Sequence, residues 1–299
     1  MATIKAFIER HPVPSYFALV FTISYGAMLP VIGGHSGLPG TPEQVARLTP
    51  LAILALMLGP SVAGILLTGV VGGRAGLHTL RARLLRWRVG ARWYAVALLA
   101  APLLGTATLA ALALISPAFL PGIVTTDDKA TMLLAGIAVG LGGGFLEELG
   151  WTGFAIPRLR QRHGVLATGL IVGLAWAAWH VPITFWTSGD AAGALVPDLF
   201  LPPFLFYVAV LPAFRVLMVW LYERTESLSA TMLMHGSLIG TTLFIIVPEA
   251  PSAASLVTWY LVLAAVLWLI VIGIAAAEGG PFSRQLLRRR VVAGEQAGG

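Results

Sequence analysis

The sequence of 299 residues contains no cysteine and few charged residues. Without cysteine there is no disulfide, no thiolate metal site and no cysteine nucleophile. Asp, Glu, Lys and Arg make up 11% of the chain, against about 25% in a typical soluble domain. Because 58% of the residues are hydrophobic, the chain has too few charges to cover a globule and too much apolar surface for one core. The composition indicates an integral membrane protein.

Long apolar runs follow one another along the chain, and they lack the alternation of β-strands. Lengths near 20 residues match the thickness of a bilayer, where helices satisfy all their backbone groups internally. We therefore expect an all-α polytopic bundle of about eight transmembrane helices, at residues 15–33, 50–72, 93–115, 130–156, 165–187, 200–222, 228–247 and 256–277.

Two segments differ from these spans. Residues 72–94 interleave leucine and tryptophan with arginine, which predicts an amphipathic helix at the membrane surface. Residues 281–299 are basic and then glycine-rich, which is typical of a disordered tail, here a cytoplasmic one. We expect residues 1–280 to form a single integral membrane domain.

The formal net charge of +6 has two interpretations. One is nucleic-acid binding, but no recognised nucleic-acid-binding module is present. The other is membrane topology, because Lys and Arg accumulate in cytoplasmic loops. With both termini in the cytoplasm, sixteen basic residues fall inside and only Arg47 and Lys129 fall outside. The sequence thus predicts a protein of a bacterial-type plasma membrane that contacts membrane lipids and no nucleic acid.

Two adjacent glutamates, Glu147 and Glu148, lie inside an apolar segment long enough to cross a membrane. A charged side chain at the bilayer centre costs at least ~2.5–3.5 kcal/mol, so such a residue points to a functional site. His180 and His235 lie in two other spans, and each alone would pass as a structural histidine. Together the four groups are natural partners in hydrocarbon. An alternative is that the glutamates lie at the inner end of their span and reach water.

A carboxylate and two imidazoles can activate a water molecule for hydrolysis of an amide. The carboxylate accepts the proton of the water, and the imidazoles orient the water or stabilise developing charge. The set Glu147, His180 and His235 could instead hold a divalent metal such as zinc, with water in the open position. Arg215 is a further charge within a span. We expect it to pair with one of the two glutamates; otherwise it must reach an interface.

The segment from Glu147 to Leu159, EELGWTGFAIPRL, resembles the first motif of the CPBP family, the CAAX proteases and bacteriocin-processing (Abi) proteins. The aromatic-x-x-x-histidine string from Trp176 to His180 resembles the second motif, and His235 the histidine of the third. The resemblance covers about residues 70–245.

This resemblance implies an eight-helix intramembrane metalloendopeptidase or glutamate-type protease, related to the Ras-converting CAAX prenyl endopeptidase. Its substrate would be a membrane-embedded or lipidated peptide. Glu147 would activate water and Glu148 would support Glu147. His180 and His235 would orient water, stabilise the oxyanion or bind metal.

Two positions depart from the motifs of the family. Thr152 stands where the first motif usually has arginine, and Arg215 could replace that charge. Ile239 stands where the third motif often has asparagine, a neutral oxyanion donor for which Ser237 or Thr241 could substitute. These departures leave open a non-catalytic membrane scaffold or bacteriocin-immunity protein of the same fold. A proton-coupled transporter is a third hypothesis, which the absence of repeat symmetry disfavours.

Overall fold

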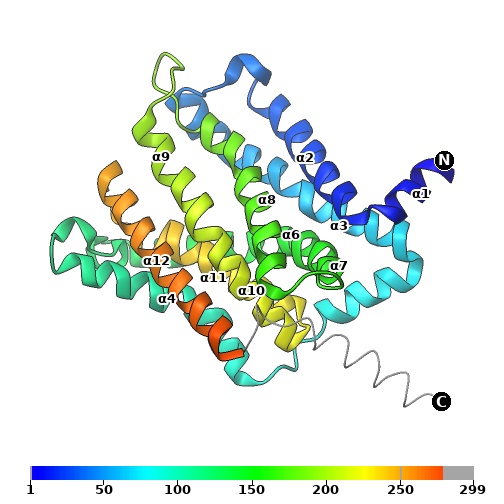
Figure 1. Cartoon of the computed structure of the whole chain (residues 1–299). Helices are drawn as coiled ribbons and strands as arrows, with labels where there is room; N and C mark the ends of the chain where they lie inside the picture. The colour runs from blue at the N-terminus through cyan, green and yellow to red at the C-terminus, as the bar shows by residue number, and fades with distance from the viewer. Residues whose placement is uncertain (1, 250, 279–299) are drawn as a thin grey trace.

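A computed structural model describes residues 2–249 and 251–278 of the chain (Figure 1). Within these residues, eight helices are long and apolar enough to cross a membrane, as the composition predicted. The described residues form no β-strand, and their only strand-like pairing is an isolated bridge between Gly189 and Leu195. The all-α polytopic bundle is therefore confirmed. The predicted tail at 281–299 lies outside the described residues.

The eight candidate spans are Pro12–Val31, Pro42–Leu84, Ala91–Ala113, Lys129–Leu159, Val165–Trp186, Pro197–Thr225, Leu228–Ile245 and Ala253–Glu278. The elements run in the order α1 (Ala2–Arg10), α2 (Pro12–Val31), η1 (Gly34–Gly37), α3 (Pro42–Leu84), α4 (Ala91–Ala113), η2 (Pro117–Phe119), α5 (Gly122–Thr125), α6 (Lys129–Gly150), η3 (Trp151–Ala155), α7 (Ile156–Leu159), α8 (Val165–Trp186), α9 (Pro197–Leu205), η4 (Phe206–Val210), α10 (Leu211–Thr225), α11 (Leu228–Ile239), η5 (Gly240–Ile245) and α12 (Ala253–Glu278).

The helix α3 is longer than a single span, and it is interrupted at Gly73. This glycine has φ 56° and ψ −149°, a conformation that a side chain with a Cβ rarely adopts. The first part of α3 crosses the bundle, and the part after Gly73 carries arginines at its exposed surface. The break thus divides a membrane span from a surface helix.

The prediction of one amphipathic helix over residues 72–94 is wrong at its C-terminal end. The helix stops at Leu84, and α4 begins only at Ala91. The intervening backbone is held in a non-helical path because the carbonyl of Arg86 accepts a hydrogen bond from Ser227 Oγ, at 2.6 Å. This contact ties the segment to the start of α11, and a contact between distant segments cannot be read from local periodicity.

The helix α10 is buried on nearly every side and lies at the centre of the bundle. It packs against α8, α11 and α12, and elsewhere in the bundle α2, α3, α6, α11 and α4 follow one another as neighbours (Figure 1). A helix that is covered all round is expected to be apolar throughout. Arg215, in the first half of α10, departs from this expectation, because it is charged and fully buried.

Two close helix contacts bring the polar residues together. On α6 and α11, a Cβ at Gly140 would collide with the carbonyl of Gly236, and a Cβ at Gly236 with the carbonyl of Gly140. On α8, a Cβ at Gly173 would lie 2.7 Å from Cα of Pro212 at the start of α10. Small residues let the backbones of membrane helices approach in this way. The glutamates of α6 are thereby placed next to α11, and α8 next to the helix of Arg215.

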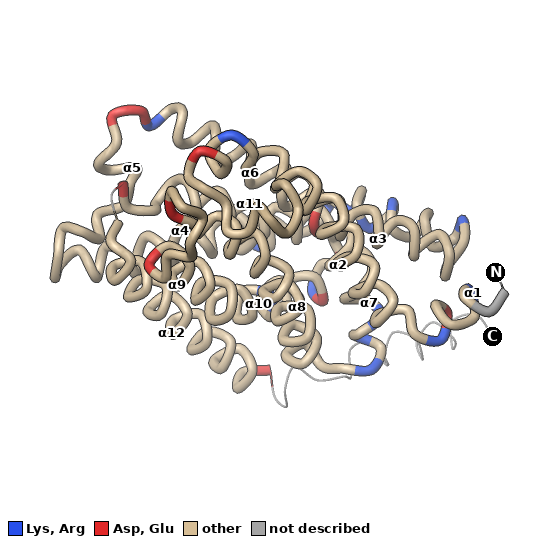
Figure 2. Tube along the Cα trace, turned by 90° about the horizontal axis from the view of Figure 1, so that it is seen from above, with Lys and Arg blue, Asp and Glu red and all other residues tan. Residues whose placement is uncertain are grey.

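Charge is distributed unevenly over the bundle. Figure 2 shows most of the Lys and Arg at the end that carries α1, α7 and the second part of α3, with acidic segments near α5 and α9 at the opposite end. This polarity agrees with the positive-inside pattern in the sequence.

Candidate active site

Glu148 is held by three side chains from three elements. Nη1 of Arg215 lies 2.8 Å from both carboxylate oxygens, and Nδ1 of His235 lies 2.8 Å from Oε1. The hydroxyl of Thr152, one turn further along, donates to Oε2. Glu148 itself is fully buried. A buried carboxylate with a guanidinium partner and two more hydrogen-bond donors is stable in its charged form, because its charge is neutralised and its lone pairs are used.

Glu147 has a different environment, although it is the neighbouring residue. Its Oε2 accepts hydrogen bonds from the indole N–H of Trp176, at 2.7 Å, and from that of Trp151, at 3.4 Å. Its Oε1 has no hydrogen bond to any described residue, and it lies 4.0 Å from Nε2 of His235. Glu147 is therefore fixed by one oxygen, and the other oxygen remains available to a reactant.

His235 joins the two glutamates. Its Nδ1 faces the charged Glu148, which can only accept, so Nδ1 carries the proton and Nε2 is a free acceptor. Nε2 is buried and has no hydrogen-bond partner among the described residues. Buried polar atoms without a partner are uncommon in folded proteins. A single water molecule within hydrogen-bond distance of Nε2 and of Glu147 Oε1 would satisfy both atoms.

Trp176 is the side chain around which the site is arranged. Its N–H donates to Glu147, the guanidinium carbon of Arg215 lies 4.0 Å from its ring centroid, and the ring of His235 meets it edge-on at 4.7 Å. A cation over the face of an indole is attracted to its π-electrons, most strongly where water is excluded. Trp176 thus fixes the positions of one acid, one base and one cation.

His180 lies one helical turn after Trp176. Its Nδ1 lies 2.8 Å from the carbonyl of Trp176 and must donate to it, which leaves Nε2 as an acceptor. The ring stacks on that of Tyr207, with centroids 4.2 Å apart and planes 15° apart. Unlike His235, His180 makes no hydrogen bond to either glutamate within the described residues, and it is only partly buried. It therefore flanks the buried pair on the more open side.

Pro182 has the local effect on α8 that its lack of an N–H predicts. The carbonyl of Ala178, which would otherwise accept from residue 182, lies 3.4 Å from the hydroxyl of Tyr25. The same hydroxyl also lies 3.3 Å from the carbonyl of Trp179. The helix of His180 is thus linked to α2 by a contact that depends on the proline.

The π-helical segments lie next to the site. The segment η3 directly follows α6, the helix of the two glutamates, η4 contains Tyr207, and η5 follows the helix of His235. A π-turn inserts a residue into a helix and changes the direction of the side chains around it, and such turns are frequent at functional sites. Trp151, the first residue of η3, is one of the residues that contact Glu147.

Several residues of this site had no role assigned to them from the sequence, although Trp176 was named as part of the second motif. The indoles of Trp151 and Trp176 donate to Glu147, and the ring of Tyr207 covers His180. For Trp151 a signal existed, because it is four residues after Glu147 and shares its helix face. Tyr207 belongs to a distant helix, and no local pattern connects it with His180.

The predicted metal set is not assembled. Among the described residues, no three His, Asp or Glu side chains are placed so that they could hold a metal ion. His235 Nδ1 is directed to Glu148, and His180 Nδ1 to a backbone carbonyl. This donor set does not fit a metal in the conformation described. The zinc hypothesis stays a prediction.

The two positions that depart from the motif have different environments. At Thr152 the hydroxyl supports Glu148, and Arg215 supplies the charge from another helix. At Ile239 the side chain packs toward Gly143 of α6. The hydroxyl of Ser237 donates to the carbonyl of Leu98, at 2.8 Å, so it is directed away from the glutamates.

Comparison with known proteins gives the family context. Residues 129–241 match the model of the family described as type II CAAX prenyl endopeptidase Rce1-like. This confirms the resemblance that the motifs indicated, and all four candidate residues and Arg215 lie within the matched stretch. A protein of Methanococcus maripaludis named CAAX prenyl protease 2 is 38% identical over 39 residues. That alignment covers 13% of this chain and 14% of the archaeal protein.

Proposed function

We propose that the protein is an intramembrane endopeptidase in which Glu147 activates the attacking water. The observation that carries this proposal is the pair formed by Glu147 Oε1 and His235 Nε2, 4.0 Å apart, both without a hydrogen bond to other described residues. The neighbouring Glu148 is fully engaged and cannot take this role. The site thus separates one reactive carboxylate from one structural carboxylate.

In the proposed reaction, the ionised Glu147 takes a proton from the water as its oxygen attacks the scissile carbonyl carbon. The carbonyl π-bond opens to an oxyanion, and the tetrahedral intermediate then breaks its C–N bond. Protonated Glu147 gives its proton to the departing nitrogen, which leaves as an amine. Such general acid–base catalysis typically contributes 10²–10⁴-fold, about 3–5 kcal/mol of the barrier.

The histidines have distinct roles in this scheme. His235, with its proton on Nδ1, accepts a hydrogen bond from the water at Nε2 and so directs it toward the carbonyl carbon. Glu148 and Arg215 fix the tautomer and the orientation of His235. His180 is the polar group on the more open side, where its Nε2 can accept a hydrogen bond from the substrate.

The substrate we propose is a membrane-associated peptide that carries a prenyl group. The support is the family description, together with an archaeal relative whose name refers to prenyl proteins. Both glutamates are almost completely inaccessible in the conformation described. A substrate must therefore displace side chains near His180 and Tyr207 before it can reach Glu147.

A non-catalytic role within the same fold is the second candidate. Two observations favour it: the buried acids, and the apolar Ile239 where the family often has an amide donor. In that case Glu147 would serve only to pair the helices through its tryptophan contacts. The catalytic and the non-catalytic role predict different effects on function when Glu147 is replaced by a neutral side chain.

The test is hydrolysis of a prenylated, internally quenched peptide by the protein in proteoliposomes made with H₂¹⁸O. The proposal predicts one ¹⁸O atom in the new carboxylate and loss of cleavage in Glu147→Gln. The matched control is Glu43→Gln, an exposed acid at the start of α3, which should cleave like the native chain. Cleavage retained by Glu147→Gln would refute the proposal. The non-catalytic role predicts no cleavage by any form.

A further inference from the structure

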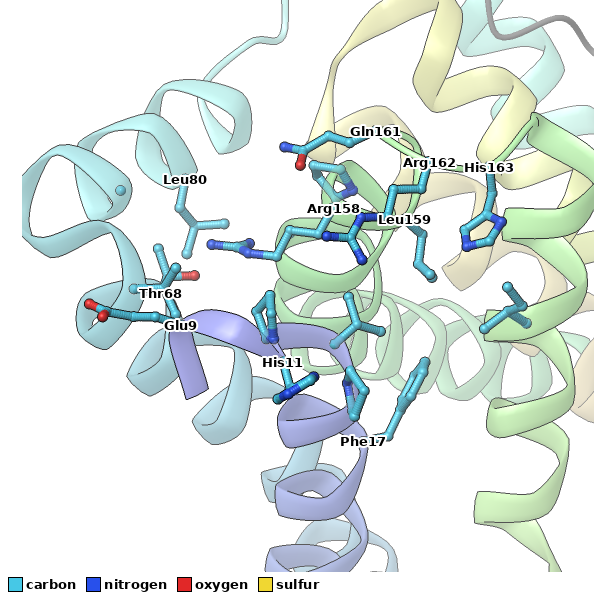
Figure 3. Close-up of a pocket in the computed structure, with 18 of the residues that line it drawn as sticks. Glu9, His11, Phe17, Thr68, Leu80, Arg158, Leu159, Gln161, Arg162 and His163 are labelled. Atoms are coloured by element: carbon cyan, nitrogen blue, oxygen red, sulfur yellow. The ribbon is translucent and has the colours of Figure 1, made fainter. Parts of the chain in front are cut away.

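A second polar region lies at the basic end of the bundle, apart from the glutamates. It is a pocket of about 740 Å³ between the start of α2, the second part of α3, and the segment after α7 (Figure 3). Four arginines line it, Arg10, Arg83, Arg158 and Arg162, with Glu9 as the acidic residue of its lining. The pocket therefore has a large excess of positive charge.

The four arginines have no acidic partner in the described part of the chain. Among residues 2–249 and 251–278, none of them forms an ion pair, whereas Glu9 is paired with Lys5, at 3.7 Å. Arg83 and Arg158 are close enough for their charges to act on each other. Arg160, directly after α7, differs from these four arginines because it is buried and forms an ion pair with Glu223, at 3.0 Å. Like charges gathered without a counterion make a site for an anion.

Arg158 is positioned as a ligand-binding group rather than as a free surface side chain. Its Nη1 donates to the carbonyl of Phe154, at 3.0 Å, and its guanidinium lies 3.7 Å over the ring of that residue. Figure 3 shows this side chain extended across the pocket toward Leu80 and Thr68 of α3. Its other N–H groups have no hydrogen bond to a described residue, so they are available to an anion in the fork geometry that suits phosphate.

The rest of the lining mixes polar side chains, such as His11, Gln161 and His163, with an apolar part. Phe17 of α2, Val71 and Leu80 of α3 and Ile171 of α8 contribute to it. A small soluble anion would use only the arginines and would leave this hydrophobic surface without a partner. A molecule with a phosphate group and acyl chains would use both parts. The pocket also lies where α2 begins and the span of the glutamates ends, at the level of a membrane surface.

We propose that this pocket binds the phosphate headgroup of an anionic phospholipid, with Arg83, Arg158 and Arg162 contacting the phosphate and the apolar lining contacting the start of the acyl chains. The site is independent of the proposed hydrolysis. It holds α2, α3 and α7 together at the basic end, since each contributes to the lining or adjoins it.

Binding is measured with phosphatidylglycerol that carries a fluorescent label at the end of an acyl chain and with the full chain purified in neutral detergent. The test variant is Arg83→Gln with Arg162→Gln. The control is Arg74→Gln with Arg81→Gln, which removes the same charge from the exposed surface of α3 outside the pocket. We expect the test variant to bind about 30-fold more weakly, and the control to bind within about fivefold of the native chain.

Other outcomes overturn the proposal. Equal weakening in both double variants would show a diffuse charge effect. Equal displacement of the probe by phosphatidylcholine and by phosphatidylglycerol would show that the headgroup charge is not recognised. Displacement by millimolar inorganic phosphate, as effective as by unlabelled lipid, would make this a site for a soluble anion. If the double variant unfolds, Arg162→Gln alone, at an exposed position, must still weaken binding about fivefold.

Discussion

Arg215 Nη1 lies 2.8 Å from both carboxylate oxygens of Glu148, although 67 positions separate the two residues. In the CPBP family, which this sequence resembles, the first motif usually has an arginine at the position of Thr152, one turn after Glu148. Here the positive charge reaches the same carboxylate from the central helix α10. The hydroxyl of Thr152 completes the contact on the near side. A change at one position of a motif can thus be compensated by a distant residue in the fold.

Replacing Arg215 by methionine should destabilise the protein strongly. Both partners of this ion pair are fully buried, and removal of one leaves an uncompensated charge, at a cost of about 3–5 kcal/mol. The measurement is equilibrium unfolding in mixed micelles. Adding Glu148→Gln to Arg215→Met should restore part of the loss, because the orphaned charge is removed.

The control for this prediction is Arg86→Met. Arg86 pairs with Glu226 at 2.7 Å, but about half of its side chain is exposed, and such pairs contribute about 0–1 kcal/mol. If Arg215→Met and Arg86→Met cost the same, the ion pair at the centre of the bundle does not have the role given to it.

The sequence predicted the bundle because each span has to satisfy its own backbone in lipid, and this constraint acts locally. It also indicated the polar residues of the site, since Glu147, Glu148, His235 and Arg215 are conspicuous in apolar segments. Their exact partners could not be predicted. Which glutamate Arg215 contacts depends on the rotation of α10 relative to α6, and two π-turns change the direction of side chains along these spans.

The end of the surface helix and the position of His180 could not be predicted from the local sequence. The pattern of 72–94 is amphipathic throughout, yet its end is pulled out of the helix by the contact between Arg86 and Ser227. His180 and His235 look equivalent in the sequence, but only His235 contacts a glutamate directly. The indole of Trp176 lies between the two histidines, and its role is visible only in three dimensions.

Trp176→Phe should reduce hydrolysis while retaining the fold. Phenylalanine keeps an aromatic face for Arg215 and His235 but loses the N–H that donates to Glu147 at 2.7 Å. A hydrogen bond to a charged group contributes about 1.5–3 kcal/mol, so kcat should fall about 10- to 100-fold if Glu147 loses its orientation. Trp220→Phe is the matched control, because its N–H donates to Glu278, at 2.8 Å, and not to a glutamate of the site.

His235→Asn separates the two functions of that histidine. The amide of asparagine can take the place of Nδ1 and donate to Glu148, but it has no atom at the position of Nε2. We expect folding to be preserved, and cleavage of the prenylated peptide to fall about 100-fold or more. His78→Asn, at an exposed position of α3, should leave the rate unchanged. A His235→Asn form that cleaves normally would remove Nε2 from the mechanism.

Removal of divalent metal should leave hydrolysis intact. Within the described part of the chain, no three His, Asp or Glu side chains are placed so that they could hold a metal ion, and Glu148 is already neutralised by Arg215. The protein is dialysed against 1,10-phenanthroline and assayed beside a soluble zinc endopeptidase treated in the same way. Loss of cleavage that zinc restores would instead favour the metal set Glu147, His180 and His235, and a different conformation of the site.

Gly140→Ala should separate the helices that carry Glu148 and His235. A Cβ at this position would collide with the carbonyl of Gly236, so α6 and α11 must move apart. Such overpacking costs about 1–3 kcal/mol of stability. It should also lower the rate of cleavage, because moving the helices apart would stretch the contact between Glu148 and His235, which is 2.8 Å long in the native protein. Gly142→Ala is the control on the same helix, where no atom lies within 4 Å of the added Cβ. It should be neutral or slightly stabilising, since alanine favours helix over glycine. Equal behaviour of the two variants in unfolding and in cleavage would show that the close approach at Gly140 does not set the geometry of the site.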